Sequence, residues 1–172
     1  MPYPDWAAEV DRSGDGSVRH FMTEPHTPAA IQFAATVPRW AYATDSLKEG
    51  IWRQDRAIAL SSRYIQTNAS HLLRYLTFDI DWPGAYFAAS DGILPPPNWI
   101  AEDRQNGRAH LGYELAAPVA KSDAARVGPL RYLAAVERGM TRRLEADPGY
   151  AGFVTKNPLS QHWRTTWLSV ST

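Results

Sequence analysis

The feature that most constrains this chain is the alternating stretch from Leu76 to Trp82, which reads Leu-Thr-Phe-Asp-Ile-Asp-Trp. Because successive side chains of a β-strand point to opposite faces, the pattern predicts a strand over residues 74–82 with its large apolar residues on a core face. Asp79 and Asp81 then share the other face, with their Cα atoms roughly 6.5–7 Å apart. Two such carboxylates repel unless they are neutralised, which favours bound Mg²⁺ or Mn²⁺. The alternative is a strand end where both face water.

A second alternating stretch runs from Gly107 to Leu115 and predicts another strand. Its polar face carries Arg108, His110, Gly112 and Glu114. If this strand pairs with the first, Arg108 and His110 lie on the same side as the two aspartates, where they can bind the phosphates of a triphosphate. A lone histidine on a strand is more often structural, and it is the neighbouring acidic strand that favours a functional role.

The remaining polar candidates follow the longest predicted helix, which starts at Gly128-Pro129 and runs to about Ala146. Asp147 comes directly after it and is a candidate third carboxylate, although an Asp-Pro-Gly turn explains it equally well and Glu114 is the rival. Residues 150–155 are predicted to form a third strand. Lys156 and Asn157 follow it, where donors to phosphate or sugar are often found.

The rest of the pattern predicts an α+β domain with a mixed or antiparallel sheet and flanking helices. A helix should begin at Pro28, with Thr27 as its N-cap, and end at Pro38. Residues 55–65 are weakly helical, so that residues 27–65 are expected to form a helical cap. A long loop over residues 83–106 includes one short strand near Trp99, and residues 163–170 are extended. The helix of residues 129–146 should cover the face opposite the aspartates.

Composition narrows the class of protein. With 44% hydrophobic and 12% aromatic residues the chain is not disordered, and no apolar run approaches the ~20 residues of a membrane span. The N-terminus lacks the pattern of a secretory signal, and the absence of cysteine excludes disulfides and thiolate zinc sites. We therefore expect a cytoplasmic protein with no membrane partner. The formal net charge of zero indicates that tight DNA binding uses a local patch or lies elsewhere.

Residues 1–26 are predicted to be a polar N-terminal segment, and residues 27–172 the domain that carries these motifs. Within the segment, Asp11 to Ser17 matches the start of a calcium loop. The twelfth position of such a loop should be a bidentate Glu and is Met22, so a Gly/Asp turn is the preferred interpretation.

These motifs together resemble those of the archaeo-eukaryotic primase superfamily: an hDhD strand (residues 78–81), an sxH strand (residues 108–110) and an hD position (Asp147). The closer similarity is to the replicase family of colicin-plasmid-type replication initiators and their phage relatives. Residues 42–47, 65–68, 107–115 and 155–158 resemble segments of that family. The resemblance covers roughly residues 38–160. One departure is Arg108, which stands where the superfamily has a small residue.

The resemblance implies a primase-like catalytic core with metal-dependent nucleotidyl transfer. Its substrates would be NTPs or dNTPs, and its nucleic-acid partner a single-stranded DNA template or a replication origin. Asp79, Asp81 and Asp147 would hold Mg²⁺ or Mn²⁺, while His110 and Lys156 would contact phosphates. Members of the family usually carry further C-terminal regions, so we expect this chain to be a catalytic fragment. The sequence leaves the oligomeric state open.

Two other classes of function fit the same residues. One is a non-catalytic initiator that keeps the fold and binds DNA, and the other is a metal-dependent nuclease or phosphatase that uses the same Asp pair. The long loop also offers candidate aromatic residues for stacking template bases, although such residues more often pack in a core. These are Trp82, Tyr86, Phe87 and Trp99.

Overall fold

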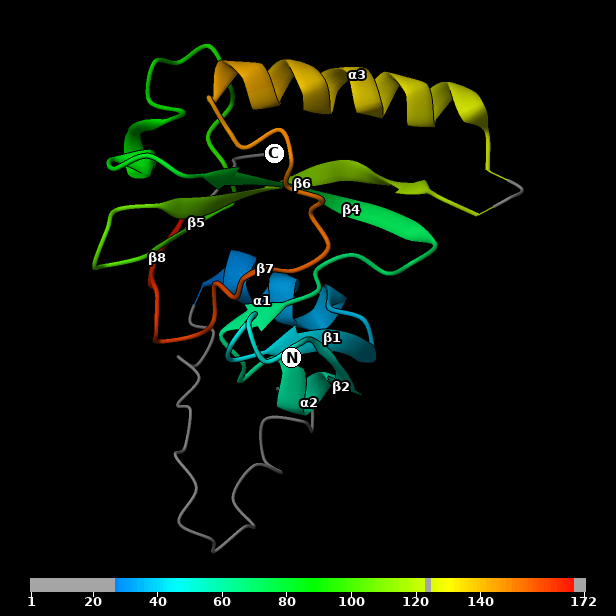
Figure 1. The fold of residues 1–172 in the computed structure, drawn as a ribbon. Helices are drawn as coiled ribbons and strands as arrows, with labels where there is room; N and C mark the ends of the chain where they lie inside the picture. Colours follow the sequence, from blue (N-terminus) through cyan, green and yellow to red (C-terminus); the bar gives the residue numbers. More distant parts are fainter. Residues whose placement is uncertain (1–26, 123–124, 169–172) are drawn as a thin grey trace, which may run out of the picture.

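The structure is a computed structural model that describes residues 27–122 and 125–168 (Figure 1). These residues form two four-stranded sheets in which every paired strand is antiparallel. The first sheet has the order β2 (Trp52–Asp55), β1 (Trp40–Thr44), β3 (Tyr64–Ile65), β7 (Thr155–Lys156). The second has the order β4 (Leu72–Ile80), β6 (Ala109–Ala120), β5 (Trp99–Glu102), β8 (Arg164–Trp167). The predicted α+β class is confirmed.

The long helix α3 (Val127–Arg143) crosses one face of the second sheet (Figure 1). Its buried residues Leu133 and Met140 join the alternate residues of β4 in one apolar cluster, namely Leu76, Phe78 and Ile80. Burying these side chains against each other holds the helix on the sheet. The polar alternates of β4 therefore face the other side, toward the first sheet.

The helix α1 (Pro28–Thr36) supports the first sheet. The hydroxyl of Thr27 accepts a hydrogen bond from the backbone N–H of Ala30 at 3.2 Å, as expected for an N-cap. Phe33 of the helix packs in a second apolar cluster with Ala41 and Ala43 of β1. The small alanine side chains allow the helix to pack close to the strand.

The predicted helical cap over residues 27–65 is wrong. Besides α1 and the four-residue α2 (Arg56–Ala59), this region contains β1, β2 and β3. The stretch Trp-Ala-Tyr-Ala-Thr of β1 alternates exposed and buried positions at first, but alanine is a weak strand former and masks that pattern. Tertiary packing on α1, rather than local propensity, makes this segment a strand.

Other boundaries also differ. The predicted third strand, residues 150–155, is a loop followed by the two residues of β7, whereas β6 extends five residues beyond the predicted Leu115 to Ala120. The short strand predicted near Trp99 is β5, and the extended C-terminal stretch contains β8. After β4 comes the short 3-10 helix η2 (Ala85–Phe87).

Trp99 of β5 is fully buried in the apolar cluster that also contains Phe33 of α1. It is paired with Gly112 of β6, and a Cβ atom at Gly112 would lie 2.0 Å from the indole ring. The glycine on the polar face of β6 is therefore needed to admit the indole. Trp99 is not available to stack on a nucleic-acid base.

The calcium-loop pattern lies outside the described residues, and the expectation that no segment spans a membrane can be compared only with the described residues. Residues 1–26, including the calcium-loop pattern that ends at Met22, are not described. Within residues 27–122 and 125–168, no helix has both the length and the apolar character needed to cross a bilayer.

Candidate functional site

The pairing of β4 with β6 brings four polar residues together at one end of the second sheet. Asp79 is the register partner of His110, and the His110 Nε2 atom lies 3.1 Å from Asp79 Oδ1. Just beyond the paired residues, Arg108 Nη1 lies 3.6 Å from Asp81 Oδ1. The two strands, whose pairing the sequence analysis took as a condition, are therefore in direct register, with their polar residues on a shared face.

A backbone hydrogen bond places Asp147 at this end of β4. Its N–H donates a hydrogen bond of 2.9 Å to the carbonyl oxygen of Asp79, which attaches the segment after α3 to the strand. The Asp147 side chain accepts a bond of 2.8 Å from the N–H of Gly149, closing the turn predicted from Asp-Pro-Gly. The loop that follows α3 is thus joined to the end of β4, four residues after the helix ends at Arg143.

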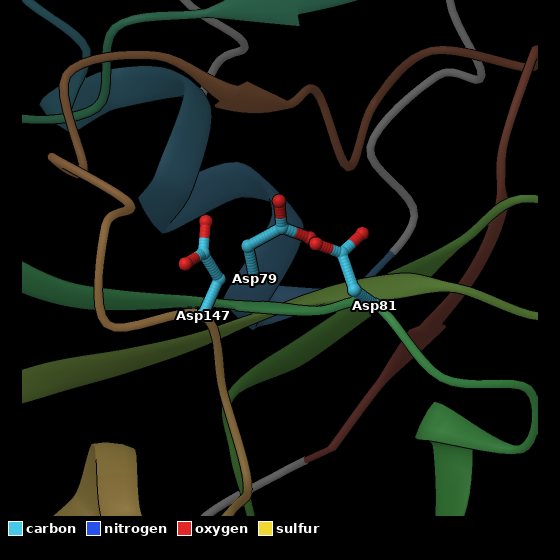
Figure 2. Close-up of side chains that lie close together, drawn as sticks. All are labelled: Asp79, Asp81 and Asp147. Atoms are coloured by element: carbon cyan, nitrogen blue, oxygen red, sulfur yellow. The ribbon is translucent and has the colours of Figure 1, made fainter.

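The three carboxylates form a cluster. One oxygen each from Asp79, Asp81 and Asp147 lies within 4.8 Å of the others, and the side chains rise on the same side of the β4 ribbon (Figure 2). The rival carboxylate, Glu114, lies farther along β6 opposite Tyr75, where it contacts Arg74 at 3.4 Å. The geometry therefore favours Asp147 over Glu114 as the third member.

His110 is held in a single tautomer. The backbone N–H of Lys156 donates to His110 Nδ1 at 3.1 Å, and the Thr155 hydroxyl lies 2.8 Å from the same atom. Because a backbone N–H can only donate, Nδ1 carries no proton, and the ring proton sits on Nε2 beside Asp79. Burial lowers the pKa of His110 and outweighs the opposing effect of Asp79, so the ring is neutral at physiological pH.

Tyr150 packs against the ring of His110. Its hydroxyl donates to the carbonyl oxygen of Val154 at 2.7 Å, and its ring lies edge-on to the His110 ring with centroids 5.0 Å apart. Neither Tyr150 nor Thr155 was identified from the sequence, because their contact with His110 spans 40 residues or more of chain. No local pattern signals such a contact.

Lys156 places a cation beside the most buried carboxylate. Its Nζ atom lies 4.0 Å from Asp79 Oδ1 and its side chain is 10% exposed, with Nζ 5.7 Å from the centroid of the Trp163 ring. Burial lowers the pKa of Lys156 and the nearby Asp79 charge opposes that change. For Asp79, burial raises the pKa, but the contacts with His110, Lys156 and Arg108 prevail and lower it, so the carboxylate is ionised.

The residues fit a divalent cation with oxygen ligands. Asp79 Oδ1 is a buried oxygen that receives no well-aligned hydrogen bond from the described residues. Three carboxylates face two basic side chains, Arg108 and Lys156, and a neutral imidazole, which leaves an excess of negative charge. Mg²⁺ or Mn²⁺ prefers carboxylate ligands of this kind and would balance that charge.

The position of Asn157 differs from the sequence-based expectation that it donates to a phosphate or sugar. Its side chain is fully buried, and its amide group donates to the carbonyl oxygens of Leu60 and Ser62, each at 2.7 Å. Its amide oxygen accepts from the N–H of Leu159 at 3.0 Å. Both amide hydrogens are thus used inside the protein. Asn157 fixes the chain directly after Lys156 and offers no free donor to a nucleotide in this structure.

Comparison with known proteins identifies one family. The model of the replicase family matches residues 36–172, which includes every residue of the site described above. Searches among curated proteins and among solved structures found no match. The family match covers well over half of the chain, from the last residue of α1 through the last described strand. The chain therefore belongs to the replicase family and has a role in DNA replication.

Proposed function

We propose that this domain catalyses metal-dependent nucleotidyl transfer on a DNA template, as a primase or primase-polymerase that acts at initiation of plasmid or phage replication. The observation that carries the proposal is the cluster of Asp79, Asp81 and Asp147 beside a neutral His110. Such a cluster is what phosphoryl-transfer sites use to hold divalent cations. Membership of the replicase family supports the same reaction.

In the proposed reaction, the oxygen of a 3′-hydroxyl forms a bond to the α-phosphorus of an NTP or dNTP. The bond from that phosphorus to the pyrophosphate breaks, and the hydroxyl proton passes to solvent. When bound, Mg²⁺ or Mn²⁺ would supply charge neutralisation at the phosphates. Asp79, Asp81 and Asp147 would hold the cations, and their geometry leaves the Nε2 proton of His110 beside the same point.

The basic residues would act on the triphosphate. Lys156 lies against Asp79 and is nearly buried, so its charge is poorly screened and would strongly attract an incoming phosphate. Arg108 is half exposed beside Asp81, where it would meet the outer phosphates or solvent. His110 would donate from Nε2 to a phosphate oxygen. We further propose that the domain has a primase-like core, because a strand with the Asp-x-Asp pattern pairs with a strand that carries a histidine. We also propose that the domain works in the cytoplasm.

The direct test is primer synthesis on single-stranded DNA with labelled NTPs or dNTPs, in Mg²⁺ and in Mn²⁺. The double variant Asp79→Asn/Asp81→Asn should lose synthesis and also lose Mn²⁺ binding measured by electron paramagnetic resonance. The matched control is Glu114→Gln, a carboxylate on the same strand pair but outside the cluster. It should keep both properties.

Three results would reject the proposal. Synthesis by the folded double variant would remove the cluster from catalysis. Degradation of labelled DNA without nucleoside triphosphates would indicate a nuclease instead. A wild-type domain that binds DNA, but shows no coupling between Mn²⁺ and nucleotide binding, would be a non-catalytic initiator. Circular dichroism establishes that each variant is folded.

A further inference from the structure

The first sheet exposes an aromatic pair on the face that also carries Lys156. Tyr42 of β1 and Phe153 of the loop before β7 have ring centroids 5.1 Å apart and a tilt of 52°. They are 37% and 46% exposed, although large aromatic side chains are usually mostly buried. Arg53 of β2 is the register partner of Tyr42 and is also exposed. Two apolar rings and one cation thus lie together on the surface.

The face of the first sheet that carries this pair leads to the candidate site through residues that are themselves buried or half-buried. Thr44 is paired with Tyr64, and Tyr64 with Lys156, so that these three residues lie in one row across the sheet. Tyr42 precedes Thr44 by two positions and therefore shares its face. By the usual spacings of strands and residues, Tyr42 is roughly 12 Å from Lys156. That distance corresponds to one or two nucleotides of an extended strand, and the Lys156 amine lies 4.0 Å from Asp79.

We propose that Tyr42 and Phe153, with Arg53 beside them, form a platform on which unpaired bases of a single-stranded DNA template stack next to the acidic cluster. The proposal rests on the function proposed above and names the surface that would hold its template. Exposed rings can stack on any base, and an arginine neutralises a backbone phosphate. Paired bases hide their faces, so the platform would select single strands over duplex. A local patch of this kind is compatible with a net charge of zero.

A second exposed aromatic pair provides the contrast. Tyr86 and Phe87 have ring centroids 5.3 Å apart and are 41% and 66% exposed. They belong to η2, whose Ala85 packs in the cluster between the second sheet and α3. This cluster lies on the opposite face of β4 from Asp79, so the pair is the natural control. Trp82 also packs partly against that cluster.

The experiment measures binding of a fluorescent oligo-dT strand to the whole chain by anisotropy. The double variant Tyr42→Ala/Phe153→Ala should bind at least about tenfold more weakly, because the loss of each stacked ring weakens binding by about fivefold or more. The control Tyr86→Ala/Phe87→Ala should bind as the wild type does. The swap Tyr42→Phe/Phe153→Tyr, which keeps both rings, should restore binding. Arg53→Gln should lower the salt dependence of binding by about one ion contact.

Several outcomes would overturn the platform. These are wild-type affinity in the Tyr42/Phe153 variant, equal losses in the two aromatic pairs, or failure of the ring-preserving swap. A change of sedimentation coefficient in the Tyr42/Phe153 variant, with DNA binding unchanged, would show that the patch contacts protein instead.

The proposed function and the platform fail separately. The Tyr42/Phe153 variant should still bind Mn²⁺, because the three carboxylates are untouched. Retained synthesis in Asp79→Asn/Asp81→Asn would reject the catalytic proposal and leave the DNA-binding result standing. Wild-type DNA affinity in the Tyr42/Phe153 variant would reject the platform and leave catalysis standing.

Discussion

The strand pair β4–β6 and the segment of residues 147–157 contribute to one site in different ways. In the strand pair, Asp79 and His110 are placed by a ladder of backbone hydrogen bonds that continues along both strands. The segment is held by fewer contacts. Asp147 is attached by one backbone hydrogen bond to Asp79, whereas Thr155 and Lys156 are held by the two-residue pairing of β7 with β3 and by their contacts with His110 Nδ1.

This difference predicts which substitutions the site tolerates and which ones disturb it. A ladder shares its stabilisation among many bonds, so that one surface substitution changes little. A segment held by single contacts can shift when one of them is lost. We therefore expect core substitutions in the strand pair to affect global stability, and substitutions in the segment to affect the site as well.

Gly112→Ala should have the largest effect on stability. Its Cβ atom would lie 2.0 Å from the fully buried Trp99 ring, so either the indole or the strand must move. We expect the free energy of unfolding to fall by about 3 kcal/mol, measured by urea denaturation. In the control Gly139→Ala, the added methyl meets no atom within 4 Å in the middle of α3. That variant should gain about 0.5–1 kcal/mol. An unchanged urea midpoint for Gly112→Ala would contradict the packing of Trp99.

Asn157→Ala tests the anchor of the segment. The substitution removes three hydrogen bonds, to Leu60, Ser62 and Leu159, and leaves buried backbone groups without partners. We expect a loss of about 2–3 kcal/mol in the free energy of unfolding, whereas the exposed Gln105→Ala should change it little. If stability were unchanged and only the KM for nucleotide rose, Asn157 would be a nucleotide contact, as the sequence suggested.

Thr155→Val removes the hydroxyl that contacts His110 and keeps the shape of the side chain. The expected loss of stability is about 1 kcal/mol, and Thr155→Ser should recover most of it. The tautomer is tested by ¹⁵N NMR of the wild type near neutral pH. The protonated nitrogen should be Nε2, because Nδ1 accepts from the Lys156 N–H. A proton on Nδ1 would contradict the arrangement described here.

Arg108→Ala should have the smallest effect on stability. Its ion pair with Asp81 is 3.6 Å long, and both side chains are more than half exposed, so solvent screens the interaction. We expect the free energy of unfolding to change by less than about 0.5 kcal/mol. If Arg108 meets phosphate, the KM for nucleotide should rise several-fold, and Arg108→Lys should restore part of it. An unchanged KM would leave Arg108 as a surface residue.

Much of the second sheet could be predicted from the sequence. The alternation around Asp79 and His110 has a period of two over long strands, which is a strong local signal. The first sheet could not be predicted in this way. Its β3 and β7 have two residues each and are joined only after about 90 residues of intervening chain. Strands that short carry no period, and their partners are defined only in the folded chain.

The alternating sequence was enough to predict that Asp79 lies on the polar face of a strand and that His110 lies on a matching strand, because side-chain direction follows from backbone geometry within a strand. Asp81 was predicted on the same strand and lies one residue beyond the end of β4. Only the tertiary structure decided between Asp147 and Glu114. The two carboxylates carry the same charge, and what separates them is the hydrogen bond from the Asp147 N–H to the Asp79 carbonyl oxygen. It also decided that Asn157 points into the protein while its neighbour Lys156 reaches Asp79, since successive residues of an extended chain face opposite ways.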